Sequence, residues 1–189
     1  GPQTVQDGFL SVSGLLTYAA VTGLAALAIG IYLVALRGEA VLWLLGAGAF
    51  FVLFYTFPLK YIGLGEPAVL VVWGPLMVGG TYYVITGEWS THVAVASIAY
   101  ALGPTAVLFG KHIDKLPADQ AKGIHTLPVI LGERRSRYAV LAMLVAQLAV
   151  VAYLVVVGYF TLAMLLCFGA APSLKRVWQV YRAPRPEAP

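Results

Sequence analysis

Apolar stretches long enough to cross a lipid bilayer recur along this chain and constrain its fold more than any other feature. Hydrophobic residues make up 60% of the 189 positions and charged residues only 11%, and the mean hydropathy is +0.85. A soluble domain of this size does not reach such values. We therefore expect an integral membrane protein that folds as an all-α polytopic bundle. About six transmembrane helices are predicted, at residues 10–36, 40–57, 67–87, 90–110, 138–157 and 159–174.

Glycine and proline pairs mark the irregular points of these predicted helices. Gly74-Pro75 should kink the third helix, and Gly103-Pro104 should break the fourth in the same way. Gly158 separates the last two helices by a very short turn, so these helices should be antiparallel neighbours. Small residues inside the spans allow close helix contact without implying a ligand.

The basic residues are distributed unevenly between the two ends of the predicted helices. With about six crossings, 11 of the 12 lysines and arginines fall on one side, and Arg37 alone falls on the other. The positive-inside rule makes the crowded side cytoplasmic. The net charge of +4 therefore reflects membrane topology and does not indicate nucleic-acid binding. The single cysteine, Cys167, excludes a disulfide framework and is expected only to pack.

The long polar interruption at residues 111–137 holds three of the eight acidic residues and six of the twelve basic ones. Carboxylates among cations at the mouth of a helical bundle suit a polyanion bound through a divalent metal. Asp114 and Asp119 are the candidate Mg²⁺ ligands, because Mg²⁺ prefers oxygen donors and completes its shell with phosphates. Candidate phosphate-binding cations are Lys111, Lys115 and Lys122. The alternative is a solvated positive loop at the membrane surface.

The spacing of the two aspartates sets a condition on this metal site. Five residues correspond to about 140° around an ideal helix, and Pro117 opposes a continuous helix through both positions. The pair can share one metal only if the helix breaks near Leu116, which we hypothesise. The neighbouring histidines, His112 and His125, fit no histidine-based metal motif and are expected to make loop hydrogen bonds.

A second polar loop, residues 55–66, lies on the same predicted side of the membrane. Lys60 is its cation and either binds a diphosphate or is an interfacial lysine that extends its ammonium towards water. The glycines at positions 63 and 65 let the backbone turn sharply, and Glu66 is expected to be a helix-end charge. Tyrosines are candidates to line a cavity, where their ring faces would favour positive charge; these are Tyr55, Tyr61 and Tyr100.

The amino-acid sequences of both loops resemble motifs of a known family. The stretch DQAKGIHTLPV at 119–129, followed by Leu131-Gly132, resembles the second aspartate-rich motif of the UbiA superfamily of intramembrane prenyltransferases. The motif departs from the family pattern in its first half, where Lys115 stands in place of the usual first aspartate and Asp114 lies one residue earlier. The loop YTFPLKYIGLGE at 55–66 is similar to that of the 1,4-dihydroxy-2-naphthoate prenyltransferase branch.

This resemblance implies a ring of transmembrane helices around a lipid-accessible cavity, formed by residues 1–189 as a single domain. It also implies an enzyme that transfers an isoprenyl chain from an isoprenyl diphosphate to an aromatic or other lipophilic acceptor, with Mg²⁺ as cofactor. Asp119, Asp114 and Lys60 would be the catalytic residues. The implied location is a bacterial or archaeal plasma membrane, with the aspartates facing the cytoplasm.

The family's first aspartate-rich motif has no counterpart in the sequence, in which Asp7 is the only acidic residue before Glu39. We therefore expect a fragment that lacks N- and C-terminal helices of the family fold and does not turn over by itself, with an unstructured tail at 183–189. The alternative is a non-catalytic UbiA-like membrane subunit or lipid-binding scaffold. Ionisable residues are absent from the middle of the predicted spans, which disfavours a transporter.

Overall fold

The computed structural model describes residues 8–183, and every regular element among them is a helix of the α, 3-10 or π type. This confirms the predicted all-α fold. The chain divides into two compact units, residues 1–46 and 47–189, which are described separately below. Of the predicted unstructured tail, only Ala183 lies within the described residues, where its backbone is extended.

The first unit contains helix α1 (Val12–Arg37) and the start of α2 (Glu39–Phe54), which continues into the second unit. The side chain of Ser11 caps α1 by accepting a hydrogen bond from the Gly14 N–H at 3.0 Å. The turn between the helices is a single glycine, Gly38, with φ +82°. A Cβ atom on Gly30 would collide with the side chain of Leu45, so this glycine permits the close packing of α1 on α2.

In the second unit, α3 (Gly65–Val71), the π-helical stretch η2 (Val72–Gly79) and α4 (Gly80–Thr86) form one continuous helix. Gly74 has non-helical angles (φ −95°, ψ −107°) immediately before Pro75, which confirms the predicted kink. A Cβ on Gly74 would lie 3.1 Å from the Ala101 Cβ and 3.3 Å from the Ser97 carbonyl oxygen. The absence of a side chain at the kink therefore lets α5 approach closely here.

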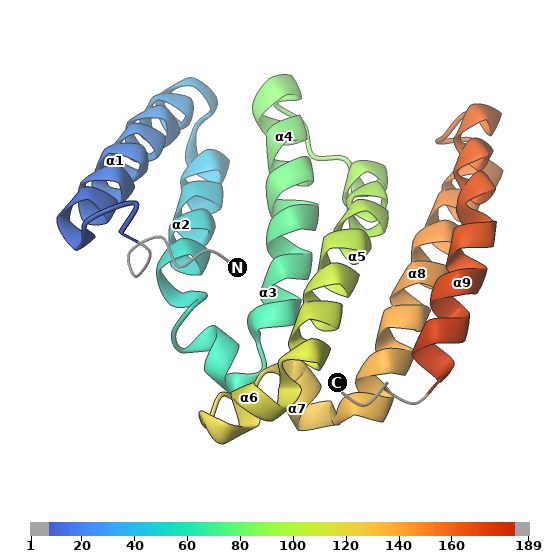
Figure 1. Ribbon diagram of the computed structural model, residues 1–189. Coiled ribbons are helices and arrows are strands. Elements are labelled where there is room, and N and C mark those ends of the chain that lie inside the picture. The colour runs from blue at the N-terminus through green and yellow to red at the C-terminus, as the bar shows by residue number, and fades with distance from the viewer. Residues whose placement is uncertain (1–7, 184–189) are drawn as a thin grey trace. The chain divides into compact units, whose positions relative to one another are not determined.

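Helix α5 (Thr91–Asp114) packs against α3, η2 and α8 and lies between them in the second unit (Figure 1). The break predicted at Gly103-Pro104 is wrong, because α5 runs through Pro104 without interruption. The adjacent Thr105 donates its hydroxyl to the Ala101 carbonyl at 2.8 Å. Hydroxyl groups of this kind compensate for backbone hydrogen bonds that a proline weakens within a membrane helix.

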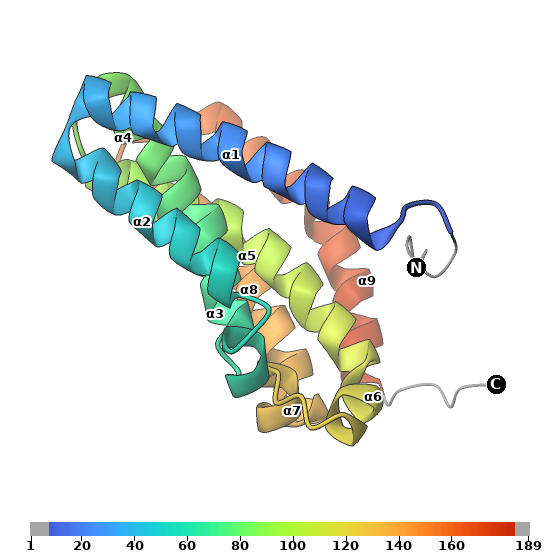
Figure 2. The same ribbon diagram turned by 90° about the vertical axis from the view of Figure 1, so that its left-hand side faces the viewer.

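The short helices α6 (Leu116–Ala121) and α7 (Leu127–Leu131) lie at one end of the second unit (Figure 2). They lead into α8 (Glu133–Val156), a turn at Gly158 with φ +76°, the 3-10 stretch η3 (Leu162–Ala170) and α9 (Ala171–Arg182). Both η3 and α9 contact α8 and run back along it (Figure 1). This confirms the antiparallel arrangement, although residues 159–174 form a 3-10 stretch and the start of α9 rather than one α-helix.

Among the described residues, four helices are long and apolar enough to cross a membrane. They are Val12–Arg37, Gly65–Thr86, Thr91–Asp114 and Glu133–Val156, and the shorter Glu39–Phe54 is also apolar. Large apolar side chains on these helices are exposed, including Ile85, Val107 and Val156 in the second unit, as expected for surfaces that contact lipid. The chain is an integral membrane protein with a polytopic helical fold.

The core of the second unit lies towards the end that carries α6 and α7. Its buried centre consists of Ala106, Phe109 and Ile113 of α5 with Val140 of α8. Leu127, Leu131 and Tyr181 pack around this centre. The polar loops predicted to form a site are therefore next to a buried apolar cluster of the helices.

Candidate active site

The turn that carries Lys60 packs against the segment that follows Asp119. This turn is the 3-10 helix η1 (Leu59–Ile62), which ends at Gly63 with φ +78°. A Cβ on Gly63 would collide with the Ile130 side chain and lie 3.5 Å from the His125 carbonyl oxygen. Only glycine combines this left-handed backbone with so close an approach. The structure thus brings together the two loops that the sequence analysis singled out.

Glu66 at the start of α3 links three elements of the site. Its side chain is 1% exposed, and Oε1 lies 2.6 Å from Nδ1 of His112 in α5. The other oxygen, Oε2, accepts the backbone N–H of Leu127, the first residue of α7, at 3.2 Å. Glu66 therefore fixes the start of α7 relative to α3 and α5.

The pairing of Glu66 with His112 was not predicted from the sequence. Glu66 was predicted to be a helix-end charge, and His112 was predicted to make a loop hydrogen bond. Glu66 does lie in the first turn of α3, but it is buried, and His112 lies in the last turn of α5 with 4% exposure. The available signal was a carboxylate next to a glycine-rich turn and a histidine at the end of an apolar helix, each in need of a partner once buried.

Asp119 is the buried carboxylate of the predicted metal pair. Its residue is 6% exposed, and its Oδ2 atom has no hydrogen-bond partner among the described residues. The Oγ1 atom of Thr126, which is fully buried, lacks a partner in the same sense. Leaving a buried polar atom unpaired costs roughly 1–3 kcal/mol. An oxygen held in this way is a suitable ligand for a bound cation.

The backbone around Asp119 forms a compact turn that fixes the position of its side chain. The Asp119 N–H donates to the Lys115 carbonyl at 2.8 Å, and the Asp119 carbonyl accepts from the N–H of Ile124 at 2.9 Å and of Lys122 at 3.2 Å. Gly123 within this turn has φ +66°. The aspartate is thus held by the short helix α6 and the turn that follows it.

Asp114 has a different environment from Asp119. It is the last residue of α5, and Lys115 separates it from α6, which confirms that the helix breaks near Leu116. The side chain of Asp114 is exposed. Burial and then the charge of Asp114 raise the pKa of Tyr181 in α9, whereas the charge of Arg137 lowers it. Asp114 therefore acts electrostatically on α9, and a shared metal with Asp119 stays a prediction.

The four lysines of the predicted diphosphate site differ in exposure. Lys60 is half-buried, whereas Lys111, Lys115 and Lys122 are exposed. Among residues 8–183 the ion pairs are those of His112 with Glu66 and of Arg137 with Glu133, so none of the four lysine ammonium groups is neutralised by a described carboxylate within 4 Å. Their charges are available to an anionic ligand.

The three candidate cavity tyrosines do not form one cluster in the structure. Tyr55 and Tyr61 flank Lys60 in the loop, where the Tyr61 ring meets Phe57 edge-on with centroids 5.6 Å apart. Tyr100 lies in α5, where its ring is 6.4 Å from that of Trp73. At 1.5 Å per residue it is about 18 Å along the helix from His112. Tyr55 and Tyr61 are thus grouped with Lys60, and Tyr100 is not.

Metal ligands of the usual kind are not clustered in threes in this part of the protein. Among residues 8–183, no three side chains of histidine, cysteine, aspartate or glutamate are placed so that they could together hold a metal ion. A metal held here by Asp119 would take the rest of its coordination shell from other sources, and the phosphate oxygens of a substrate are such a source for Mg²⁺.

Comparison with known proteins agrees with the family resemblance found in the sequences of the two loops. The model of the UbiA prenyltransferase family matches residues 4–189. Among curated proteins, the 1,4-dihydroxy-2-naphthoate octaprenyltransferase of Haemophilus influenzae is 37% identical over 99 residues, 52% of this chain and 32% of that protein. The 2-carboxy-1,4-naphthoquinone phytyltransferase of Synechocystis is 31% identical over 97 residues, 50% of this chain and 32% of that protein.

A more distant relative is the UbiA prenyltransferase domain-containing protein 1 of Homo sapiens, which is 32% identical over 73 residues, 39% of this chain and 22% of that protein. No solved structure matches the chain. The matched stretches thus span about a third or less of each curated relative. The family match, by contrast, covers nearly all of the present sequence, and the chain therefore belongs to the UbiA prenyltransferase family.

Proposed function

We propose that this chain forms part of a membrane prenyltransferase that transfers an isoprenyl chain from an isoprenyl diphosphate to an aromatic acceptor. The observation that carries the proposal is the buried Oδ2 of Asp119, which has no hydrogen-bond partner among the described residues. The turn that carries Lys60, a residue without a described carboxylate partner, packs against residues 125 and 130 of the segment that follows Asp119. A buried oxygen that lacks a donor favours a cation, and unneutralised lysines favour phosphate. The names of the similar naphthoate-directed transferases support an aromatic acceptor of the naphthalene type.

In this reaction the allylic C–O bond of the diphosphate breaks, a C–C bond forms at the ring carbon of the acceptor, and that carbon loses a proton. Mg²⁺, when bound, would neutralise charge on the departing diphosphate. Asp119 fits such an ion, because a hard carboxylate oxygen is the donor that Mg²⁺ prefers. Asp114 is proposed as a second ligand from the sequence alone.

The remaining residues of the site would position and neutralise the diphosphate. Lys60 would bind diphosphate oxygens from the turn that packs on residues 125–130, and Lys111, Lys115 and Lys122 would add charge from the opposite loop. The faces of Tyr55 and Tyr61 would shield positive charge on the isoprenyl carbon, each by about 0.5–2 kcal/mol. The site would face the cytoplasm of a bacterial or archaeal cell, where diphosphates and Mg²⁺ are available.

The proposal is tested by assaying the full-length protein in lipid nanodiscs. Isoprenyl diphosphates of several chain lengths are offered with 1,4-dihydroxy-2-naphthoate, and diphosphate release is measured with Mg²⁺ and with EDTA. We expect Mg²⁺-dependent release that is lost in Asp119→Ala. Release that is unchanged by EDTA and by this substitution would refute the assigned site.

The second candidate is a non-catalytic subunit or lipid-binding scaffold. It is favoured by Lys115, which stands where the resemblance leads us to expect the first aspartate of the motif, and by the exposed position of Asp114. A full-length protein that binds isoprenyl diphosphate without releasing diphosphate in the presence of acceptor and Mg²⁺ would support this candidate.

A further inference from the structure

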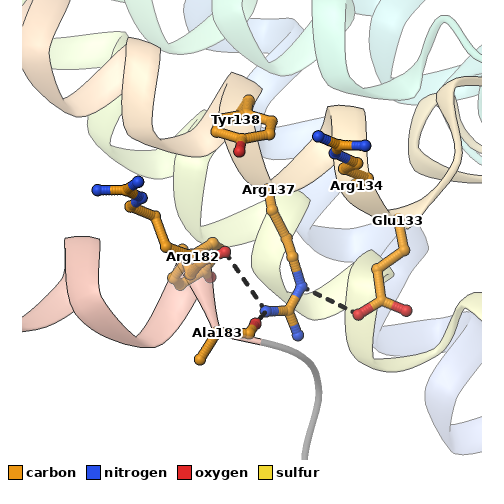
Figure 3. Close-up of a pocket in the computed structure, with 7 residues that line it drawn as sticks. Glu133, Arg134, Arg137, Tyr138, Arg182 and Ala183 are labelled. Carbon is orange, nitrogen blue, oxygen red and sulfur yellow. Dashed lines mark hydrogen bonds and ion pairs between the residues drawn. The ribbon is translucent and has the colours of Figure 1, made fainter.

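A cavity lined by charged side chains lies between the start of α8 and the end of α9 (Figure 3). Its volume is about 440 Å³. The α8 wall consists of Glu133, Arg134, Arg137 and Tyr138, and the α9 wall consists of residues 181–183. None of these residues belongs to the proposed prenyl-transfer site, so the cavity requires its own explanation.

Arg137 forms the fixed floor of the cavity. Its Nε donates to Glu133 Oε1 at 2.9 Å, and its Nη1 donates to the Ala183 carbonyl at 2.6 Å. The same Nη1 lies 3.4 Å from the carbonyl oxygens of Val180 and Tyr181. The arginine thus satisfies carbonyl groups at the end of α9, where a cation is favourable, and ties this end to α8.

Two further arginines remain without such partners. Arg134 and Arg182 are exposed, and neither forms an ion pair or a hydrogen bond within residues 8–183. They lie on either side of Arg137 (Figure 3), so positive charge is spread across the mouth of the cavity. Three arginines and one glutamate give the lining a formal charge of +2. An anion is the ligand that this arrangement favours, and the planar guanidinium suits phosphate oxygens.

The cavity lies at the polar boundary of a membrane helix. Glu133 is the first residue of the candidate span Glu133–Val156, and the ring of Tyr138, which is 50% exposed, follows five residues later. Tyrosine is typical of the interface between lipid and water. Just beneath the cavity, Val140 and Phe109 begin the apolar core, against which Tyr181 packs. Phospholipid head groups occupy this level of the bilayer, and basic pockets between membrane helices bind them.

We propose that this cavity binds a phosphate group, and that in the membrane this group is the head-group phosphate of an anionic phospholipid. The acyl chains would lie along the apolar surface of α8, below Tyr138. This inference goes beyond the proposed prenyl transfer and does not depend on it. A bound lipid would join the end of α9 to α8 in addition to the Arg137 contacts.

The chain supplies a matched control for this proposal. Arg135 is exposed and lies between Arg134 and Arg137 in sequence, but it does not line the cavity. Arg135→Gln therefore removes the same charge from the same end of α8 without altering the cavity. If these arginines only anchor the helix at the membrane surface, then Arg134, Arg135 and Arg182 should have equivalent effects.

The test uses native mass spectrometry of the full-length protein in detergent, titrated with phosphatidylglycerol or phosphatidylcholine. We expect saturable phosphatidylglycerol binding that weakens about tenfold or more in Arg134→Gln/Arg182→Gln, because charge-assisted hydrogen bonds are lost. The Arg135→Gln control should bind like the wild type. Phosphatidylcholine should bind all forms weakly and equally.

Inorganic phosphate separates the two possible sources of the phosphate group. Failure of millimolar phosphate to displace phosphatidylglycerol supports the lipid assignment, whereas displacement at equimolar phosphate overturns it in favour of a soluble ligand. Equal weakening in Arg135→Gln and in the double variant overturns the cavity proposal altogether. If the double glutamine variant does not fold, Arg134→Gln and Arg182→Gln are tested singly, and each should lose part of the affinity. Full affinity in both single variants would overturn the proposal.

Discussion

The Oε1 atom of Glu66 and the Nδ1 atom of His112 lie 2.6 Å apart, in side chains that are 1% and 5% exposed. The two residues are 46 positions apart in sequence, so their contact joins the start of one membrane helix to the end of another. The second carboxylate oxygen of Glu66 accepts a hydrogen bond from the N–H of Leu127. The glutamate therefore ties both helices to the start of α7, which follows the turn of Asp119.

Replacement of Glu66 by alanine should destabilise the protein strongly. The substitution leaves His112 Nδ1 and the Leu127 N–H buried without their partner, and breaking a buried pair in this way costs about 3–5 kcal/mol. Thermal unfolding in detergent, followed by circular dichroism, measures the effect. Glu88→Ala is the matched control, because Glu88 is exposed and its loss should change stability by less than about 0.5 kcal/mol. Equal effects of the two substitutions would contradict the role given to Glu66.

Replacement of Asp119 by asparagine should separate activity from stability. The amide keeps the shape of the side chain but removes a buried charge whose Oδ2 has no partner in the described structure, so the melting temperature should stay the same or rise. Mg²⁺-dependent diphosphate release should fall by roughly 10²–10³-fold, as expected when one electrostatic stabiliser of a transition state is removed. A variant that melts lower and keeps its activity would show that Asp119 has a structural role only.

Gly63 and Gly123 allow the contact between the two loops to be tested without touching a charged residue. Both have positive φ angles, +78° and +66°, so alanine is strained at either position. A Cβ meets Ile130 and His125 at position 63 and open space at position 123. Gly63→Ala should therefore destabilise the protein by about 1 kcal/mol or more beyond Gly123→Ala, and should raise the KM for isoprenyl diphosphate by moving Lys60. Similar KM values in both variants would argue against the pairing of the loops.

The pKa of Tyr181 predicts how stability changes in alkaline solution. Burial and Asp114 raise this pKa above its ordinary value of 10.0 in the folded protein, so the phenol of the unfolded chain loses its proton first. The stabilisation is complete below pH 10 and is lost as the pH rises through the folded pKa. Melting temperatures between pH 8 and 11 should fall less steeply in Tyr181→Phe. Asp114→Asn should lower the pKa of the Tyr181 phenol. This pKa is measured from the ultraviolet absorbance of the phenolate as the pH rises, with Tyr181→Phe as the reference that lacks this phenol.

Features that depend on residues adjacent in sequence could be predicted from the sequence. Apolar length predicted the long helices, and Gly74-Pro75 predicted the kink. Pro117 together with the aspartate spacing led to the hypothesis of a break near Leu116, which the structure has at Lys115. The type and bounds of the last helix were harder to predict, because its apolar half is a 3-10 helix and its α-helical half is polar. The continuation of α5 through Pro104 was not predicted, because the packing of α5 against α3, η2 and α8 does not show in the local sequence.

Features that depend on residues far apart in sequence could not be predicted from the sequence. The partners of Glu66 lie 46 and 61 positions away, and periodicity does not predict such pairings. The burial of Asp119 and the exposure of Asp114 depend in the same way on how α6 folds back after α5. The candidate residues were identifiable, but their division into buried and exposed members required the structure.

The π-helical stretch between α3 and α4 has a consequence for comparing this chain with its relatives. A π turn contains about one residue more than an α turn, so deleting a single residue within 72–79 would bring this stretch closer to α-helical spacing and leave Glu66 and Tyr83 on similar faces. A deletion that spares Gly74-Pro75 would keep the kink. Anywhere else in this helix, the same deletion would rotate everything beyond it by about 100°. A one-residue gap opposite Gly74-Pro75 in a relative is therefore compatible with an unchanged site at the far end of the helix.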